Sequence, residues 1–280
     1  MDELLGRSSF LVIDRIAGPG AFLALDASED PDTILLPARE IPEGVGEGDR
    51  VEVFVYLDSD DRPIATTTMP RLELGEVTFL EVTAVTDVGA FVDWGLPKEL
   101  LVPFAEQSRE LHVGERQPIG LYLDKSGRLA GTMFVTDMVA GRPPRTALDQ
   151  WLPGEAWRND PDIGLFAILE RSYVGLVPAS EPHRLRRGDK AEFRVAAILP
   201  DGKLVLSLRR HAHEEAAADA ETILRVLSRP NAPRVGDRSS PDDIRDLFGL
   251  SKKAFKRAVG KLLKERKVTL ADDGSLVIVR

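Results

Sequence analysis

The chain has 280 residues and a formal net charge of −9, 30% of its residues are charged, and it contains no cysteine. The absence of cysteine excludes disulfides, thiol catalysis and cysteine-ligated zinc, and the acidic balance argues against attraction of the whole protein to a polyanion. No apolar run reaches the roughly 18–20 residues of a membrane span, and the acidic start Met1-Asp2-Glu3 is unlike a signal peptide, so we expect a cytoplasmic protein of several small domains with no membrane partner.

Three short signals recur in the same order, three times each, along the chain. The first is a glycine two residues before a phenylalanine, at Gly20-Ala21-Phe22, Gly89-Ala90-Phe91 and Gly164-Leu165-Phe166. The second ends in a proline, at Leu35-Leu36-Pro37, Leu101-Val102-Pro103 and Leu176-Val177-Pro178. The third is a glycine followed by an acid and a base, at Gly48-Asp49-Arg50, Gly114-Glu115-Arg116 and Gly188-Asp189-Lys190. Chance does not readily keep three signals in register, so this part of the chain is a tandem repeat.

Each repeat has the patterning of β-strands. In the first repeat Val51, Val53 and Val55 occur at every second position, and Ile119 and Leu121 follow the same parity in the second. Glycine and proline separate about five short strands per repeat, the count of an OB-fold barrel, whose outer strand face binds oligonucleotides. The sequence therefore predicts a mainly β fold, with three OB-type barrels at residues 1–72, 73–140 and 141–210.

A small α/β unit is expected at the C-terminal end. An alanine- and glutamate-rich run predicts a connecting helix over residues 211–233, and a winged helix-turn-helix over residues 234–280 follows from a helix capped by Ser240, a second helix capped by Ser251 and a terminal hairpin. Segment 234–280 holds 12 Lys and Arg against 7 Asp and Glu. This local excess of positive charge indicates an anionic partner, with an ordinary solvated face as the alternative.

The motifs resemble a known RNA-binding module. The stretches G-A-F-V at 89–92, G-L-V-P-A-S at 175–180 and G-D-K at 188–190, with the ending Leu206-Ser207-Leu208-Arg209, are similar to the OB module of ribosomal protein S-one. Three such modules followed by a winged helix resemble the bacterial conserved virulence factor B family over essentially the whole chain. Two features of the module are missing, because Pro19, Val88 and Ile163 replace an aromatic residue before the glycine, and Pro37, Pro103 and Pro178 replace a histidine.

The resemblance implies which residues contact RNA. The phenylalanine of the module stacks on a base, and its aspartate and the arginine four residues later match Asp58 with Arg62 and Asp124 with Arg128, whereas the third repeat has only Lys203. The aromatic candidates are Phe22, Phe91, Phe166 and Tyr173. The cationic candidates are Arg128, Arg171, Lys203, Arg209, Lys253, Arg257 and Lys264.

The repeats differ in charge, and the aromatic candidates have alternatives. Cations crowd the third repeat, which favours Phe166, whereas Asp26, Glu29 and Asp30 lie beside Phe22 and disfavour it. Each phenylalanine also has the alternative of a buried core position, and Trp94 and Trp157 either extend the aromatic surface or pack between domains. The sequence alone leaves these choices open.

These observations predict a non-catalytic protein that binds single-stranded RNA with loose sequence preference and regulates gene expression after transcription. One alternative is a DNA-binding regulator with the helix of residues 252–267 in a major groove. A second is a protein-interaction scaffold whose barrels have lost RNA contacts and dock a ribosome-associated protein. Asp58, Asp60 and Asp61 suit a turn better than a nuclease site, and His211 and His213 lack further ligands, so no catalytic residue, metal, cofactor or small-molecule substrate is expected.

Overall fold

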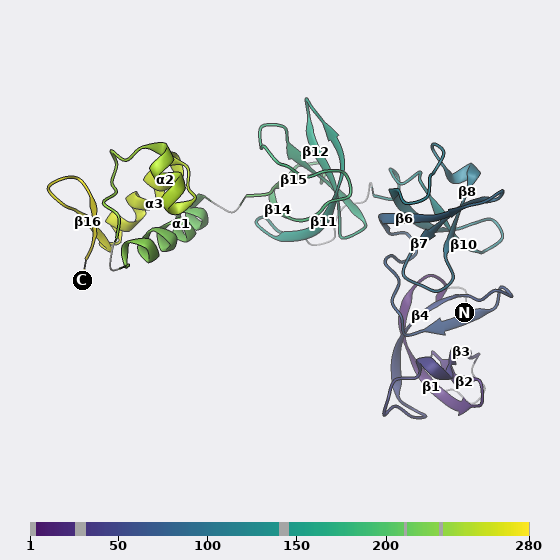
Figure 1. The fold of residues 1–280 in the computed structure, drawn as a ribbon. Coiled ribbons are helices and arrows are strands. Elements are labelled where there is room, and N and C mark those ends of the chain that lie inside the picture. Colours follow the sequence, from purple (N-terminus) through teal and green to yellow (C-terminus); the bar gives the residue numbers. More distant parts are fainter. Residues whose placement is uncertain (1–3, 26–31, 140–145, 210–211, 230–231, 280) are drawn as a thin grey trace. The chain divides into compact units, whose positions relative to one another are not determined.

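The computed structural model describes residues 4–25, 32–139, 146–209, 212–229 and 232–279. The chain divides into two compact units, Met1–Leu208 and Arg209–Arg280. Three five-stranded sheets make up the described part of the first unit, and helices with a two-stranded hairpin make up that of the second (Figure 1). Within the described ranges, no helix is both long and apolar enough to cross a membrane.

The three sheets follow one another along the chain. The strands of the first are β1 (Ser8–Ala17), β2 (Gly20–Ala24), β3 (Ile34–Pro37), β4 (Arg50–Leu57) and β5 (Pro63–Thr66). Those of the second are β6 (Val77–Val85), β7 (Gly89–Asp93), β8 (Leu100–Pro103), β9 (Arg116–Leu123) and β10 (Leu129–Thr132). Those of the third are β11 (Trp151–Asp160), β12 (Gly164–Leu169), β13 (Tyr173–Pro178), β14 (Lys190–Ile198) and β15 (Leu204–Ser207). Short 3-10 helices, η2 (Ala38–Glu40) and η3 (Phe104–Glu106), follow β3 and β8.

The strand order is that of an OB-type barrel. The first sheet closes in the order β1-β2-β3-β5-β4, and the third closes in the equivalent order β11-β12-β13-β15-β14. The second sheet runs β10-β9-β6-β7-β8, so β8 and β10 are its edges. The predicted fold of three barrel-like sheets is confirmed, with the second sheet left open along one seam.

Two of the repeated sequence signals are cross-strand partners. Gly20 pairs with Pro37, and the equivalent glycines of β7 and β12 pair with the prolines that end β8 and β13. A Cβ added to Gly20 would lie 2.0 Å from the carbonyl oxygen of Leu36, and φ of this glycine is +153°. Only glycine allows strands to approach so closely here, which explains why this signal recurs in every repeat.

The third repeated signal forms the turn that leads into the fourth strand. Gly48 has a φ of +88°, in the left-handed region that favours glycine. The acid that follows the glycine caps the turn, since a carboxylate oxygen of Asp49 accepts the backbone N–H of Gly46 at 2.8 Å, and Asp189 accepts that of Arg186 at 2.7 Å. These side-chain acceptors satisfy backbone donors that the turn leaves without strand partners.

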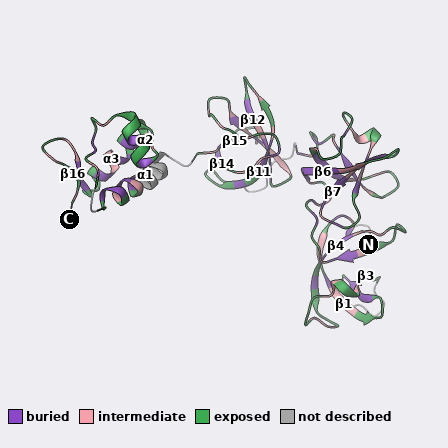
Figure 2. Cartoon of the chain, in the orientation of Figure 1, coloured by how far each residue is buried: buried purple, intermediate pink, exposed green. Residues whose placement is uncertain are grey.

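The sheets are joined by shared apolar packing. Phe54 of β4 lies in the same core cluster as the buried residues of the second sheet, and its ring meets Trp94 edge-on with 5.8 Å between centroids. Phe79 of β6 and Ile168 of β12 belong to another shared cluster, against which Trp157 packs. The interiors of the sheets are dominated by buried residues (Figure 2). Trp94, only 3% exposed, therefore packs between domains and does not extend the outer aromatic surface.

The second unit has one core. Its elements are α1 (Ala212–Leu227), α2 (Pro241–Phe248), α3 (Lys252–Lys264), β16 (Val268–Leu270) and β17 (Leu276–Ile278). Ser240 and Ser251 cap α2 and α3 as predicted, and Gly249 ends α2 in a left-handed conformation. Ile223 of α1 is buried in the same cluster as Phe255 of α3. The helix that we expected to be only a connector is thus part of the C-terminal unit, because its apolar face covers α3.

Candidate nucleic-acid interface

The outer face of the second strand of each sheet carries the phenylalanine that the sequence suggests for base stacking. Phe22 lies on β2, Phe91 on β7 and Phe166 on β12, and all three side chains are half-buried. A β-bulge in the preceding strand shifts the register just before the residue that stands opposite each ring. The residues opposite the three rings are Arg15, Ala84 and Arg158 respectively.

The three rings therefore have different surroundings. The guanidinium carbon of Arg15 lies 4.3 Å from the centroid of the Phe22 ring, and that of Arg158 lies 4.6 Å from the centroid of the Phe166 ring. Both distances fit a cation–π contact. Opposite Phe91 stands Ala84, which has no group that can cover the ring. Phe91 is the ring without a facing guanidinium among the three.

Phe91 lines a cavity of about 250 Å³. Tyr56 and Asp61 of the first sheet and Lys98, Leu101 and Arg128 of the second also line it. The cavity thus brings together two residues that the sequence suggests separately, Phe91 and Arg128. Lys98 was not expected from the sequence, because it lies in a segment between β7 and β8 that carries no repeated signal.

The aspartates beside this cavity hold turns. One carboxylate oxygen of Asp58 accepts the backbone N–H groups of Asp60 and Arg62, at 2.8 and 2.9 Å. Asp124 accepts the hydroxyl of Ser126 at 2.6 Å and the backbone N–H of Arg128 at 3.0 Å. Hydrogen bonds from Arg62 and from Ser126, respectively, are the main causes that lower the pKa of Asp58 and Asp124.

These turns are not arranged as a metal centre. In the described ranges, no three His, Asp or Glu side chains gather as a metal site would require. His211 lies outside the described residues, as does the side chain of His213. Asp26, Glu29 and Asp30, which the sequence places beside Phe22, lie outside them as well.

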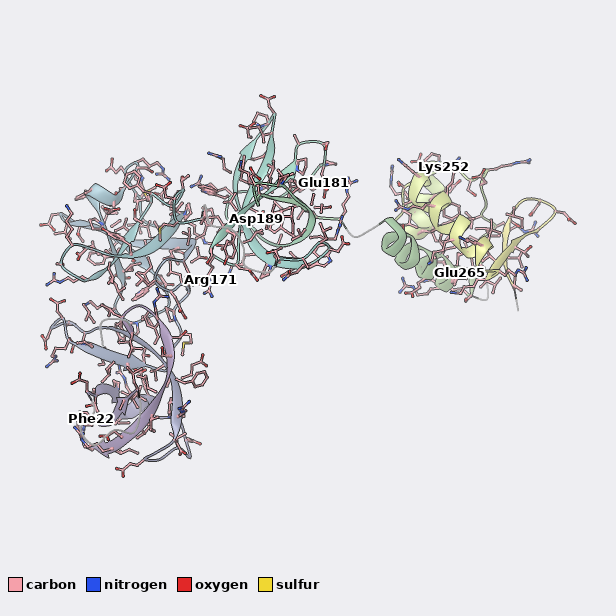
Figure 3. The ribbon with its side chains drawn as sticks, turned by 180° about the vertical axis from the view of Figure 1, so that it is seen from behind. Phe22, Arg171, Glu181, Asp189, Lys252 and Glu265 are labelled. Atoms are coloured by element: carbon pink, nitrogen blue, oxygen red, sulfur yellow. The ribbon has the colours of Figure 1, made fainter. Side chains whose placement is uncertain are left out.

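The three cationic candidates of the first unit already have acidic partners. Arg128 pairs with Asp61, Arg171 pairs with Glu76 at 3.2 Å, and Lys203 pairs with Asp201 at 2.7 Å. Figure 3 shows Arg171 among the side chains of this unit. Exposed pairs of this kind are worth about 0–1 kcal/mol, so a phosphate can replace the acid at little cost.

Two further candidates lie at the start of the second unit and in the third sheet. Arg209 follows β15, and its side chain is exposed. Tyr173 begins β13, is half-buried and packs against the core of the third sheet. Tyr173 therefore has a packing role and presents only part of its ring to a ligand.

A larger cavity of about 850 Å³ lies between strands of the second and third sheets. Its arginines are engaged with the protein, since Arg171 donates to the carbonyl of Arg71 at 2.9 Å and Arg116 lies 3.6 Å from Glu155. Buried Glu155 accepts the hydroxyl of Thr78 at 2.7 Å and the N–H of Phe79 at 3.0 Å. These groups hold the two sheets together, so the cavity is a structural junction.

Two exposed aromatic residues were not among the site residues predicted from the sequence. Phe104 begins η3 with 51% of its surface exposed, and Phe134 follows β10 with 56% exposed. The N–H of Met133 donates to the carbonyl of Glu106 at 2.8 Å, which joins the two segments. An alignment of the three repeats makes these two rings visible in the sequence. At the position of Phe104 the other repeats have Ala38 and Ala179, and at the position of Phe134 they have Thr68 and Arg209. At these two positions, the second sheet alone of the three has aromatic residues.

A glutamate stands three residues after each repeated proline, at Glu40, Glu106 and Glu181. Glu40 accepts the hydroxyl of Thr66, and Glu181 accepts that of Ser207 at 3.1 Å. Glu106 instead hydrogen-bonds the hydroxyl of Tyr122. Burial is the main cause that raises the pKa of Tyr122 to about 12, and the negative charge of Glu106 adds to it.

The basic face of the C-terminal unit lies on α3. Lys253 and Lys264 are exposed and make no ion pair among the described residues. Arg257 lies 3.8 Å from Asp219 of α1, so it also ties α3 to the rest of the unit. Figure 3 shows Lys252 and Glu265 at the two ends of this helix.

Family models match most of the chain. The S1 domain matches residues 5–68 and 74–134, and the CvfB-like winged helix domain matches residues 221–275. The third sheet lies outside these matches but has the strand order of the first. The S1 domain, an OB-type barrel, and the winged helix are both nucleic-acid-binding folds.

Relatives extend over nearly the whole chain. YitL of Bacillus subtilis is 32% identical over 94% of this chain and 90% of its own length. Conserved virulence factor B of Staphylococcus epidermidis is 29% identical over 99% of this chain and 96% of its own length. A crystal structure of a multidomain protein with nucleic acid binding domains from Streptococcus pneumoniae covers 99% of both chains, with 28% identity and a TM-score of 0.42. The resemblance expected from the motifs is confirmed: the chain belongs to the conserved virulence factor B family, with S1 domains and a CvfB-like winged helix domain.

Proposed function

We propose that this protein binds single-stranded RNA with loose base preference and regulates gene expression after transcription, without a catalytic step. The observation that carries the proposal is the ring of Phe91, which stands opposite Ala84 and not opposite an arginine, and which shares a cavity with Lys98 and Arg128. An aromatic platform beside cations is the arrangement by which OB-type barrels hold single strands, with bases on the ring and phosphates on the cations. Unpaired bases are required, because a base inside a duplex has no free face.

The cations contribute by exchanging partners. Arg128 and Lys203 are paired with acids through exposed contacts. Such contacts are weak, and each phosphate that replaces an acid also releases counterions from the RNA. We therefore expect affinity to fall steeply as salt is raised, although the whole chain carries a net charge of −9.

The C-terminal unit supplies further phosphate contacts in this proposal, through Lys253, Lys264 and Arg257 on α3. A duplex-DNA regulator is the main alternative, since α3 has the position of a recognition helix. Asp272 and Asp273 lie at the tip of the β16–β17 hairpin, and a hydrogen bond from Ser275 lowers the pKa of Asp273. An ionised wing tip repels the backbone of a rigid duplex that lies along both α3 and the wing, whereas a flexible single strand can contact α3 without approaching the wing.

The proposed setting is the cytoplasm, and the proposed partner is single-stranded RNA, with a ribosome-associated protein as the alternative. Crosslinking of the full chain to cellular RNA, followed by mapping of the attached peptides, tests this. We expect crosslinked peptides from β7 and the Lys98 segment and from α3. The absence of RNA crosslinks on these peptides, or partners that survive nuclease treatment without any RNA crosslink, would contradict the proposal.

A further inference from the structure

The third repeated signal ends in a basic residue at the start of the fourth strand of each sheet. This residue is Arg50 on β4, Arg116 on β9 and Lys190 on β14. Arg116 and Lys190 both line the cavity of about 850 Å³ between the second and third sheets. A guanidinium nitrogen of Arg116 donates to the carbonyl of Gly188, two residues before Lys190, at 3.4 Å. Equivalent cations of neighbouring repeats therefore converge on one cavity.

Arg116 has donor capacity left for a ligand. It donates to the carbonyls of Gly188 and Phe79 at 3.4 and 3.2 Å, and it lies 3.6 Å from Oε1 of Glu155. The last distance is too long for a hydrogen bond, and this buried oxygen accepts none from a described residue. A guanidinium carries five N–H donors, so several of those of Arg116 remain available.

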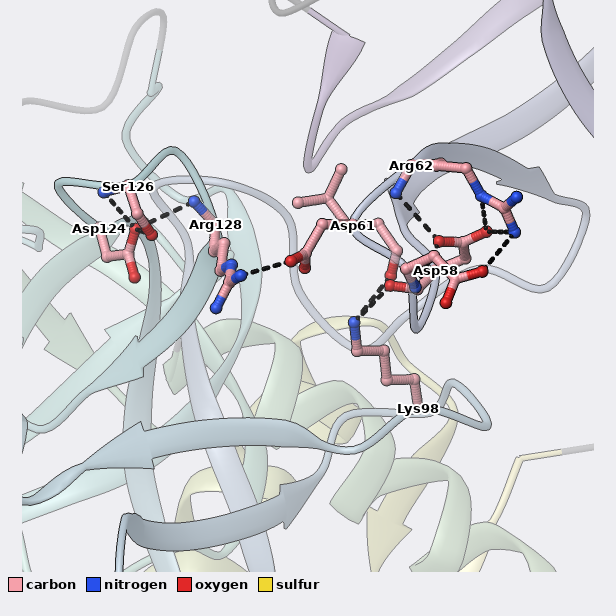
Figure 4. Close-up of polar contacts among 9 residues, drawn as sticks. Asp58, Asp61, Arg62, Lys98, Asp124, Ser126 and Arg128 are labelled. Carbon is pink, nitrogen blue, oxygen red and sulfur yellow. Dashed lines mark hydrogen bonds and ion pairs between the residues drawn. The ribbon is translucent and has the colours of Figure 1, made fainter.

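Lys190 is exposed and makes no ion pair in the described part of the chain. The cations of the smaller cavity differ, because the protein already holds them. Lys98 donates to the carbonyl of Asp58 at 2.8 Å. Arg128 pairs with Asp61 (Figure 4). Together with Arg116, Lys190 thus makes one end of the larger cavity a cationic site with open donors.

The other end of the larger cavity carries carboxylates. Glu170 and Glu192 line it, are exposed, and pair with no cation within the described ranges. Glu192 follows Lys190 by two residues on β14, so the two side chains leave the same face of the strand about 7 Å apart. Glu170 lies near Glu192, because its N–H donates at 3.0 Å to the carbonyl of Pro153, the residue opposite Glu192. The cavity therefore has a basic end and an acidic end.

The backbone at the acidic end is strained. Glu170 and Arg171 have φ values of 46° and 59°, in the left-handed region that favours glycine or asparagine. Contact with the second sheet holds this turn, since the carbonyl of Arg171 accepts the N–H of Val77 at 2.7 Å. Strained residues that the surrounding structure fixes are frequent at ligand sites.

We propose that this cavity binds a small phosphate ester with neighbouring hydroxyl groups, a free nucleotide or a sugar phosphate, at a site separate from the RNA-binding face. The phosphate lies against Arg116 and Lys190, a planar fork and a point charge that both suit its terminal oxygens. The hydroxyls donate to Glu170 and Glu192, as ribose hydroxyls do to acidic side chains in nucleotide sites.

The size and place of the cavity agree with this assignment. Small-molecule pockets occupy about 300 to 1,000 Å³ and are frequent where domains meet, and this cavity has about 850 Å³. Such a ligand was not expected from the sequence, because the basic end is completed only where two repeats meet.

Calorimetric titration of the full chain with inorganic phosphate, ribose phosphate and adenosine monophosphate tests the proposal. We expect both esters to bind about ten-fold or more tightly than inorganic phosphate, because only the esters also reach the carboxylates. Tighter binding of adenosine monophosphate would identify a nucleotide as the ligand, and equal binding a sugar phosphate. Binding of inorganic phosphate alone, or of none of these probes, would overturn the proposal.

The informative variant is Lys190→Ala, and Arg50→Ala is its matched control. Lys190→Ala should weaken binding of both esters about ten-fold, the loss expected for one hydrogen bond to a charged group. Arg50→Ala removes the equivalent cation of the first repeat, which does not line the cavity, and should leave binding unchanged. Glu192→Gln should bring the affinities of the esters closer to that of inorganic phosphate. Equal losses in Lys190→Ala and Arg50→Ala would reduce the effect to net charge and overturn the site.

Thermal unfolding gives an independent readout, since a ligand that binds the folded state stabilises it. Ribose phosphate should raise the melting temperature of the wild-type chain and of Arg50→Ala, and should not raise that of Lys190→Ala. Displacement of ribose phosphate by single-stranded RNA would assign the cavity to the path of the RNA and overturn a separate small-ligand site. A chain that binds the esters but no RNA would contradict the proposed function alone and support this inference.

Discussion

The guanidinium carbon of Arg158 lies 4.6 Å from the centroid of the Phe166 ring. A cation over an exposed ring contributes about 0.5–1 kcal/mol, and a base that stacks on Phe166 must displace it or share the ring with it. We therefore expect the ring in the cation-rich third sheet, which the sequence favoured, to be less available to a base than the ring of Phe91.

A double-mutant cycle tests this competition. Phe166→Ala should cost less than about 1 kcal/mol of affinity for single-stranded RNA in the wild-type chain, and clearly more in an Arg158→Ala background, where the ring is uncovered. Binding titrations at constant salt measure both values. Additive effects would show that Arg158 does not compete with a base for the ring.

The lysines of α3 should set part of the salt dependence. Lys253→Ala with Lys264→Ala removes two exposed cations without an ion pair in the described ranges, so the slope of log K against log salt should flatten by about 0.7 for each lost phosphate contact. Lys261→Ala with Lys267→Ala is the matched control, because Glu265 pairs with both of these lysines. An equal change in slope for the two double variants would contradict a specific role for Lys253 and Lys264.

Asp61 should act as a competitor of RNA for Arg128. Asp61→Asn removes the ion pair with Arg128 and should raise RNA affinity several-fold, because the cation is then released for phosphate. Asp60→Asn removes the same charge one residue away, where the partner is Arg62 at 2.8 Å. If both variants raise affinity equally, only net charge matters and the pairing of Asp61 with Arg128 has no special effect.

Tyr122 should titrate late in alkaline solution. Its pKa is raised to about 12, and Glu106→Gln should lower it toward 10 because the neighbouring negative charge is removed. Ultraviolet absorbance of the phenolate, followed against pH for both proteins, measures the shift. The folded-state pKa lies above the unfolded value of about 10, so the folded state favours the protonated phenol. The contribution of Tyr122 to the free energy of unfolding is therefore fully present below pH 10 and is lost as pH rises toward 12. An unchanged titration in Glu106→Gln would contradict the contact.

Much of the fold was predictable because its signals are local. The repeated glycines and prolines reflect strand pairs such as Gly20 with Pro37, and the serine caps of α2 and α3 have direct sequence signatures. The packing of α1 into the C-terminal unit was also predictable, because Ala220, Ile223 and Leu227 share one helical face. The alanine-rich start of this helix suggested a connector instead.

The details of the site were harder to predict. Arg15 stands opposite Phe22 only because the ladder shifts between Ile13 and Arg15, and strict alternation along a strand cannot reveal such a bulge. The pairing of Asp61 with Arg128 joins residues 67 positions apart on two different sheets. Contacts between repeats depend on packing that no single repeat contains.

The most direct measurement is competition between single-stranded RNA and duplex DNA of the same sequence for the full chain, at one fixed salt concentration. The account predicts that unlabelled RNA displaces a labelled RNA strand at far lower concentration than the duplex does, because only unpaired bases can reach Phe91. Displacement by the duplex at equal or lower concentration than the RNA would contradict it.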